Sequence, residues 1–319
     1  MVAGFHLWAA QPNTHKDGLF SIFKHGEAGV DIFFVISGFI IYFTAHGRSN
    51  LTIRSFAALR FWRILPPYWA ILIFYIFSLV FLSIMTSDYS ELPSTSSLAV
   101  SFFLLPYPDH IIIIAWTLSM ELLFYLLFAI SFIGGGARLF FFAMTTWVLA
   151  SQIFTHGNFG SSPWLNFILH TAVLEFFWGA IIARLYLTGQ RRFRNLALFL
   201  GFALLGFYFA DILVLPVGRE WLPGVPAALI VYGLLGRQWH IPSWAILWGE
   251  SSYILYLAHL LVFGVSGTIM RIVFGMDVYT SLPVLITLLL GVILLSMLLS
   301  WGIERPYQNW YRQRFISKS

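Results

Sequence analysis

Ionisable side chains interrupt the apolar stretches of this chain at a few positions, where they have the types and spacing to do chemistry. His6 lies in a short apolar segment, and Glu121 lies within a longer one. Because charges and imidazoles are costly in hydrocarbon, such residues are functional candidates. A carboxylate beside an imidazole fixes its tautomer and raises its basicity, as a general base requires. His6 and Glu121 are therefore candidates for a catalytic pair.

The two candidates are expected in the same half of a bilayer. With a helical rise of about 1.5 Å per residue, His6 lies roughly 6 Å below the outer surface and Glu121 roughly 15–18 Å beyond Asp109. Helix tilt can bring the two side chains within hydrogen-bond reach. The alternative is that each residue only bonds a neighbouring helix and holds the bundle together.

A pair of arginines has a spacing that suits a phosphate-bearing ligand. Arg60 and Arg63 are three residues apart, so they share a face of a helix. Two guanidiniums can hold phosphate oxygens through bidentate hydrogen bonds. The same residues are equally typical of positively charged anchors on the cytoplasmic side of a membrane. Pro66 and Pro67 follow them, and we predict that the next membrane helix begins there.

Several polar residues accompany these candidates. Trp116, Ser119 and Tyr125 can form a polar seam with Glu121. No metal site is expected. Supporting roles are predicted for six residues: Asp31, Ser37, Trp116, Ser119, Tyr125 and His259.

A second polar stripe has a simpler explanation. Ser252, Tyr256 and His259 are spaced by four and three residues, so they share one helical face. A stripe that faces the interior of a helix bundle explains this spacing without chemistry. The same structural role is favoured for His170 and Glu175.

The elements that carry these residues are predicted to be membrane-spanning helices. Hydrophobic residues make up 59% of the 319 residues and charged residues 10%, with a mean hydropathy of +0.83. A soluble domain contains roughly 25% charged residues, and a spanning helix needs about 20 apolar ones. Runs that approach this length are 30–46, 66–86, 111–133, 138–155, 163–187, 195–215, 222–236, 250–274 and 279–303.

These runs predict an all-α fold, a polytopic transmembrane helix bundle of about ten helices with the first truncated. The segment Met1–Ala10 is too short to span and is expected to be the outer end of that first helix. One membrane domain is predicted over residues 1–319, with a basic cytoplasmic tail at about 304–319. The chain has no Cys, which excludes disulfides, and no cleavable signal peptide is expected.

The positions of Lys and Arg predict the orientation, because cytoplasmic segments carry an excess of both. With 47–65 in the cytoplasm, the outer segments hold only Lys16, Lys24, Arg219 and Arg271. The basic residues on the cytoplasmic side are spread over several segments. The net charge of +5 is thereby explained by topology, and nucleic acid is not an expected partner.

Five segments resemble the acyltransferase 3 family, in the family's order and over nearly the whole chain. Gly29–Phe39 (GVDIFFVISGF) resembles its GVDLFFVLSGF signature, and Arg60–Trp69 (RFWRILPPYW) resembles its RxxR segment. Ala115–Tyr125 (AWTLSMELLFY) resembles WSLSxExxFY and looks closest to exopolysaccharide O-acetyltransferases. Ser252–His259 (SYILYLAH) resembles SYxxYLxH, and Glu304–Pro306 (ERP) resembles the usual E+P ending.

The resemblance implies a multi-pass enzyme of the bacterial inner membrane, in contact with membrane lipid. Members move an acyl group, often acetyl from acetyl-CoA, to a hydroxyl of a surface or secreted glycan or a lipid-linked sugar. His6 matches the family's essential His, Arg60 and Arg63 match the arginines associated with the acyl-CoA donor, and Glu121 matches its acidic residue. Acyl-CoA would be a substrate, and no bound cofactor is implied.

One family feature is not found in the sequence. The family places an Arg or Lys eleven residues before its essential His, and that position would precede Met1. An inactive truncated homologue is therefore one alternative. A transporter or flippase for a lipid-linked glycan is another, since it would share the buried polar groups but cleave no thioester.

Overall fold

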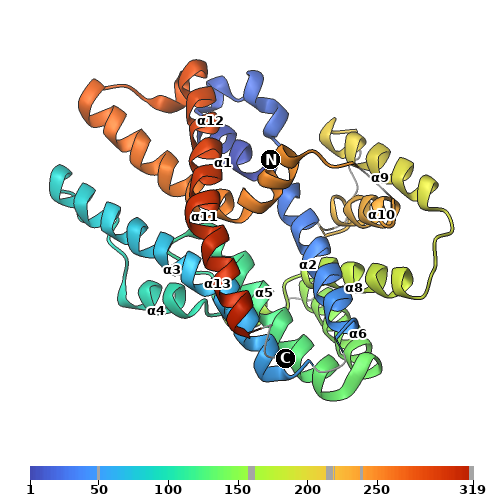
Figure 1. The fold of residues 1–319 in the computed structure, drawn as a ribbon. Helices are drawn as coiled ribbons and strands as arrows, with labels where there is room; N and C mark the ends of the chain where they lie inside the picture. The colour runs from blue at the N-terminus through green and yellow to red at the C-terminus, as the bar shows by residue number, and fades with distance from the viewer. Residues whose placement is uncertain (49–50, 157–161, 213–217, 219, 238–239, 316–319) are drawn as a thin grey trace.

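Helices form the whole regular structure of the described residues. The computed structural model describes residues 1–48, 51–156, 162–212, 218, 220–237 and 240–315, and no strand occurs among them. The α-helices are α1 (Val2–Ala10), α2 (Ala28–His46), α3 (Ile53–Thr86), α4 (Thr95–Phe103), α5 (Trp116–Phe128), α6 (Gly134–His156), α7 (Pro163–Ile168), α8 (Val173–Leu187), α9 (Arg194–Phe209), α10 (Gly224–Leu234), α11 (Ser243–Phe274), α12 (Leu282–Leu299) and α13 (Arg305–Phe315). Figure 1 shows their arrangement.

Short 3-10 and π-helical segments complete the helical part of the chain. The 3-10 segments cover Asn13–His15, Leu19–Phe23, Ile113–Ala115 and Val278–Thr280, and the π-helical turns cover Ala129–Ile133 and Ser300–Glu304. The predicted basic positions Arg219 and Lys318, the last residues of the run 195–215 and the end of the predicted tail lie outside the described residues.

The structure confirms an all-helical fold with candidate membrane-spanning helices, but it does not confirm ten of them. Six helical stretches in the described part of the chain are long and apolar enough to cross a bilayer: Leu19–His46, Ile53–Thr86, Ile113–Phe154, Pro163–Leu187, Ser243–Phe274 and Leu282–Tyr311. Their outward faces are apolar, and Phe77 on α3 is 74% exposed. Such faces suit contact with lipid chains rather than water.

The difference in helix number has an identifiable geometric origin. Ile113–Phe154 combines two predicted runs, which are separated at Gly134–Gly136, where Gly136 has a φ of 83°. Only Gly adopts this backbone region readily. Helices α9 and α10 have 16 and 11 residues, and a 16-residue helix is about 24 Å long, shorter than a hydrocarbon core of about 30 Å.

Helix α3 contradicts the prediction that a membrane helix begins at Pro66. It begins at Ile53, where Thr52 and Ser55 form a capping box, and it continues through Pro66. Pro66 has no N–H to donate to the carbonyl of Trp62, and the Tyr307 hydroxyl donates to that carbonyl instead, at 2.7 Å. A neighbouring helix thereby satisfies the freed backbone group. Both arginine candidates consequently lie within α3.

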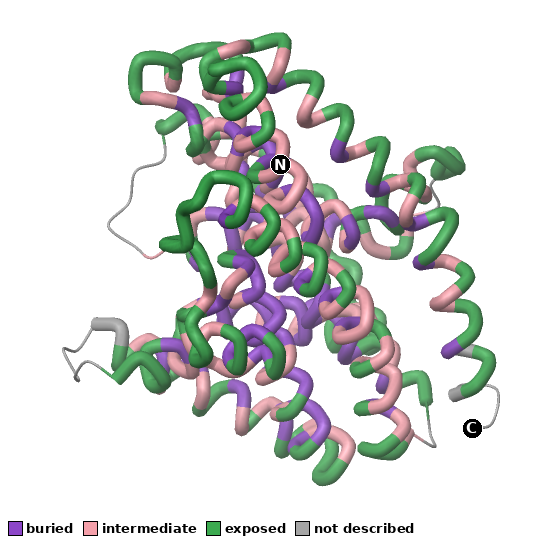
Figure 2. The backbone as a smooth tube through the Cα atoms, turned by 90° about the vertical axis from the view of Figure 1, so that its left-hand side faces the viewer, coloured by how far each residue is buried: buried purple, intermediate pink, exposed green. Residues whose placement is uncertain are grey.

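Helices α2 and α8 make the closest crossing in the core. A Cβ added to Gly38 would lie 2.1 Å from the carbonyl oxygen of Phe176, and one added to Gly179 would lie 2.1 Å from that of Val35. Small residues allow this approach of two membrane helices. Buried residues concentrate where the helices cross, and exposed ones follow the outer faces and the loops (Figure 2).

We expect Gly38→Ala to destabilise the fold, because the new methyl group meets backbone rather than a movable side chain. Overpacking of this kind costs about 1–3 kcal/mol, so Tm in detergent should fall by roughly 5 °C. Gly291→Ala is the matched control, since nothing lies within 4 Å of a Cβ at that helical position. Equal Tm values for the two variants would contradict the role assigned to the crossing.

Candidate functional site

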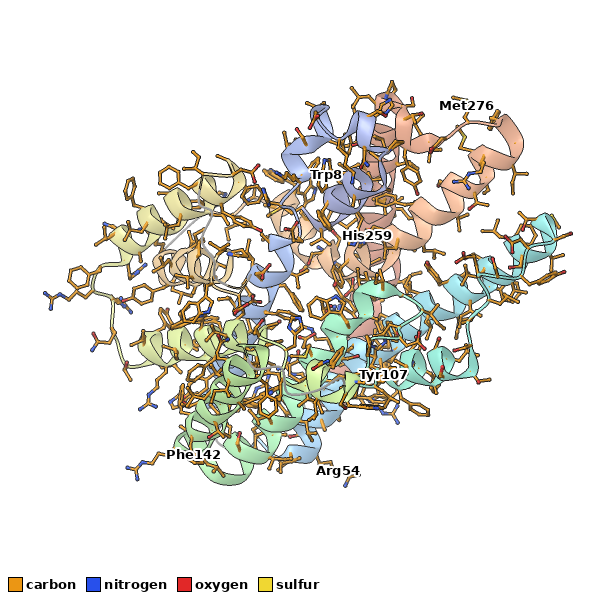
Figure 3. The ribbon with its side chains drawn as sticks, turned by 180° about the vertical axis from the view of Figure 1, so that it is seen from behind. Trp8, Arg54, Tyr107, Phe142, His259 and Met276 are labelled. Carbon is orange, nitrogen blue, oxygen red and sulfur yellow. The ribbon has the colours of Figure 1, made fainter. Side chains whose placement is uncertain are left out.

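The first element of the site is a pair of imidazoles, which we call the histidine pair: His6 on α1 and His259 on α11. His259 Nε2 lies 3.1 Å from His6 Nδ1, and the ring centroids are 5.0 Å apart. His259 is completely buried, whereas His6 is half-buried. Figure 3 places His259 below Trp8, which lies on the same short helix as His6.

Apolar packing holds α1 in the position that forms this pair. Leu7 is completely buried and joins Phe20, Phe263 and Leu285 in one cluster, which contains residues of α11 and α12. Leu7 is the neighbour of His6 in sequence, and Phe263 is one helical turn beyond His259. The orientation of His6 is therefore fixed by the burial of its neighbour as well as by its own hydrogen bonds.

The second element is a charged group that we call the arginine cluster: Arg60, Arg63, Glu121 and Tyr125. The Tyr125 hydroxyl donates a short hydrogen bond to the Glu121 carboxylate, and the Ser37 hydroxyl donates to the same oxygen at 3.4 Å. The carboxylate also interacts electrostatically with both guanidiniums. Glu121 is 4% exposed, so this interaction is little screened by water.

Glu121 is not the hydrogen-bond partner of His6 that the sequence suggested. The expected depth assumed an α-helix running from Asp109, but α5 begins at Trp116, and the residues between them are bends followed by the 3-10 turn Ile113–Ala115. Glu121 therefore lies with the α3 arginines. The partner of His6 is His259, for which the sequence favoured a structural role.

The two arginines keep hydrogen-bonding capacity unused. Arg60 lies over the rings of Phe56 and Tyr125, with its guanidinium carbon 5.3 Å from each centroid. Its Nε is buried and has no partner in the described part of the protein. The side chain of Arg63 is exposed. Donors held by aromatic stacking rather than by ion pairs remain available to an anionic ligand.

Helices α5 and α11 connect the two elements. The Tyr253 hydroxyl donates to the carbonyl of Ile64, the residue after Arg63, at 2.8 Å. Tyr253 and His259 are six residues apart on α11, which corresponds to about 9 Å along the helix axis. On α5, Thr117 lies one turn before Glu121 and forms a 2.8 Å hydrogen bond with Tyr256. The histidine pair and the arginine cluster are thus separated by only a few helical turns.

The remaining predicted residues surround these elements. Trp116 packs against Phe34 and His170, with centroids 6.0 and 5.1 Å apart. Asp31 is buried in the first turn of α2, where the helix dipole favours a negative charge. Ser252 is exposed and bonds the Gly249 carbonyl, so the predicted interior stripe on α11 begins only at Tyr256.

Comparison with known proteins decides the family. The acyltransferase 3 profile, described as an acyltransferase domain, matches residues 1–301. The chain belongs to the acyltransferase 3 family. The exopolysaccharide production protein ExoZ of Rhizobium meliloti strain 1021 is 32% identical over 263 residues, which is 74% of this chain and 76% of that protein. No solved structure gives a significant match.

One buried contact in this acyltransferase 3 protein, that of His110 with Ser119, could not be predicted from the sequence. His110 is 9% exposed, and its Nε2 lies 3.1 Å from the Ser119 hydroxyl. The hydrogen bond ties the non-helical entry segment to α5, two residues before Glu121. Position 110 lies outside the apolar runs, so nothing in the sequence marked it as buried.

We expect His110 to make the stability of this acyltransferase sensitive to acid. Burial lowers the pKa of His110 from 6.5 to about 4. The unfolded chain binds a proton at this residue below about pH 6.5, whereas the folded chain does not until about pH 4. Stability therefore falls as the pH decreases between these values, by about 1–2 kcal/mol at pH 5. In His110→Gln, the decrease in Tm from pH 7 to pH 5 should be smaller, and an unchanged decrease would contradict this origin.

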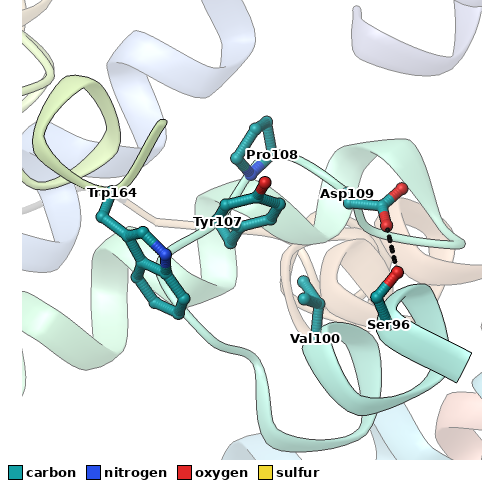
Figure 4. Close-up of a pocket in the computed structure, with 6 residues that line it drawn as sticks. All are labelled: Ser96, Val100, Tyr107, Pro108, Asp109 and Trp164. Carbon is teal, nitrogen blue, oxygen red and sulfur yellow. Dashed lines mark hydrogen bonds between the residues drawn. The ribbon is translucent and has the colours of Figure 1, made fainter. Parts of the chain in front are cut away.

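A surface hollow lies apart from the histidine pair. Its volume is about 550 Å³, and Ser96, Val100, Tyr107, Pro108, Asp109 and Trp164 line it (Figure 4). Tyr107 and Trp164 have ring centroids 5.1 Å apart, and Asp109 accepts hydrogen bonds from Ser96 and Ser97. Tyr107 is well separated from His259 in Figure 3. Trp and Tyr at such a position are typical of the boundary between membrane and water.

Proposed function

We propose that this protein transfers an acyl group, most simply acetyl, from acyl-CoA to a hydroxyl of a cell-surface or secreted glycan. One observation carries the proposal: a half-buried imidazole of His6 lies close to a cluster with unused guanidinium donors. The family supports acyl transfer, and the name of the ExoZ relative supports exopolysaccharide as the kind of acceptor. The lipid-facing helices and the distribution of basic residues suit the bacterial inner membrane.

The arginine cluster is the donor site in this proposal. Arg60 and Arg63 bind phosphate oxygens of acyl-CoA from the cytoplasmic side through paired N–H donors. Glu121 attracts both guanidiniums by its charge, and its hydrogen bond with Tyr125 within α5 fixes the ring over which Arg60 lies. The pantetheine arm then extends along α11, past Tyr253 and toward the histidine pair.

His6 provides the base for the transfer step. Its Nε2 removes the proton of the acceptor hydroxyl while that oxygen attacks the thioester carbonyl carbon. The carbon–sulfur bond breaks, and the CoA thiolate takes the proton from the imidazolium. The products are the glycan ester and free CoA thiol. Apolar side chains around the pair exclude water, which limits hydrolysis of the thioester.

The same nitrogen also permits a two-step route. Attack of His6 Nε2 on the thioester would give an acyl-histidine and release CoA before the acceptor binds. The two routes differ in one observable. Labelled acyl-CoA leaves label on the protein in the absence of acceptor only in the two-step route.

Mass spectrometry of surface and secreted glycans, with and without the gene, tests the proposed function. Deletion should remove one acyl mass, 42 Da if the group is acetyl, and the gene should restore it in the deleted strain. The strain complemented with His6→Gln should lack the acyl mass although the protein is present in the membrane. Identical glycans in all strains would contradict the proposal.

A further inference from the structure

We propose that His259 is a positioning residue that holds His6 in one tautomer, with the proton on Nδ1 and the lone pair of Nε2 free for chemistry. The inference rests on the proposed function and adds a residue to its site. It follows from the hydrogen bonds of the histidine pair, because each ring contacts a backbone carbonyl that can only accept.

The carbonyl contacts determine which nitrogens carry protons. His259 Nδ1 lies 3.1 Å from the Leu255 oxygen, so Nδ1 is the protonated nitrogen of that ring. His6 Nδ1 lies 3.0 Å from the Val2 oxygen, so Nδ1 is also protonated in His6. Both carbonyls lie four residues earlier on the same helix.

The contact between the rings is then a hydrogen bond with a defined direction. His259 is completely buried, and no carboxylate in the described residues forms an ion pair with it, so its neutral form is the stable one. A neutral ring protonated on Nδ1 offers a lone pair on Nε2. That lone pair accepts the proton that His6 Nδ1 donates, across 3.1 Å.

This arrangement leaves the catalytic nitrogen unoccupied. No described residue forms a hydrogen bond with His6 Nε2. The Val2 carbonyl and His259 share the Nδ1 proton, which stabilises this tautomer of the neutral ring and also the imidazolium that forms during the reaction. A ring held from one side by an acceptor and open on the other is oriented as a general base or nucleophile requires.

Packing fixes His259 itself. Tyr256 and Phe263 flank its ring, with centroid distances of 6.1 and 5.8 Å. Tyr256 is bonded in turn to Thr117 and to the Ile114 carbonyl, at 2.8 and 3.1 Å. The position of His259 is therefore determined by α5 as well as by its own helix.

Three substitutions at position 259 separate positioning from packing. His259→Leu removes the atom that accepts the hydrogen bond from His6. His259→Gln places an amide oxygen near the position of the lost Nε2. In His259→Asn the side chain is polar but too short to bring its oxygen to that position. With purified protein, acetyl-CoA and glycan acceptor, we expect His259→Leu and His259→Asn to lower kcat about 100-fold. His259→Gln should stay within about tenfold of the native protein, and KM for acetyl-CoA should change by less than about threefold in all variants.

Matched controls remove the effect of folding. Ser252 lies on an exposed part of α11, so Ser252→Ala should keep full activity. The Tm of each variant in detergent identifies any variant that is poorly folded. Unchanged kcat in His259→Leu would overturn the proposal. Equal losses in the Gln and Asn variants would also overturn it, since packing alone would then explain the effect.

A measurement without turnover distinguishes failure of this inference from failure of the proposed function. In 15N NMR of protein labelled at histidine, the His6 signals are identified by their loss in His6→Gln. They should show a single tautomer protonated at Nδ1 in the native protein and a mixture in His259→Leu. A native protein that transfers no acyl group contradicts the proposed function, whereas an unchanged His6 tautomer in His259→Leu contradicts the role of His259.

Discussion

Replacing His6 with Gln is expected to lower kcat for acyl transfer by about 10³-fold, within the range that loss of a general base causes. The amide is not basic, so neither deprotonation of the acceptor nor attack on the thioester proceeds through this position. KM for acyl-CoA should change little, because the donor is bound by the arginine cluster. Rates of CoA release from purified protein at varied acyl-CoA concentration measure both constants.

His15→Gln is the matched control for this substitution, because His15 belongs to the same N-terminal segment but is exposed. It should retain the native kcat. The His6 variant should also keep its Tm within a few degrees, since His6 is half-buried and loses only one or two hydrogen bonds, each worth about 1 kcal/mol. A His6 variant that transfers acyl groups at the native rate would exclude this imidazole from the chemistry.

The double substitution Arg60→Lys with Arg63→Lys is expected to raise KM for acyl-CoA about 100-fold while kcat changes by only a few-fold. Lys keeps the positive charge but loses the planar fork that binds phosphate oxygens in pairs. Charge-assisted hydrogen bonds contribute about 1.5–3 kcal/mol each, and about 2.8 kcal/mol corresponds to a 100-fold change in affinity. Donor titrations at saturating acceptor measure the effect.

Arg54→Lys provides the control on the same helix. Arg54 is exposed near the start of α3, at the lower edge of Figure 3. Its replacement by Lys should therefore leave the KM for acyl-CoA unchanged. If the double variant and this control have the same KM for acyl-CoA, Arg60 and Arg63 do not bind the donor, and their positive charge at the membrane surface is enough to explain their presence. A fall in kcat with constant KM would instead assign them to the transfer step.

The sequence predicted most of what depends on residue type and local spacing. Apolar runs located helices such as α2 and α12, and the shared face of Arg60 and Arg63 follows directly from their three-residue spacing. The family was also recognisable, because segments such as Gly29–Phe39 combine fixed residues with fixed order. These features need no knowledge of which helices touch.

Contacts between distant helices could not be predicted in the same way. Glu121 was expected beside His6, but the bends and the 3-10 turn before Trp116 change its position, and no propensity argument indicated that they replace an α-helix. The continuation of α3 through Pro66 depends on a hydroxyl 241 residues later, that of Tyr307. The sequence predicts His259 to be polar and interior. Its hydrogen bond with His6, however, depends on the packing of Leu7, which holds α1 in place.

The most direct test of the account is a transfer assay with purified protein, glycan acceptor and acetyl-CoA labelled in its acetyl group. We predict that free CoA thiol and labelled glycan ester appear in equal amounts, and that neither appears with His6→Gln. Movement of a lipid-linked glycan across the membrane without thiol release, or ester formation that survives the loss of His6, would contradict it.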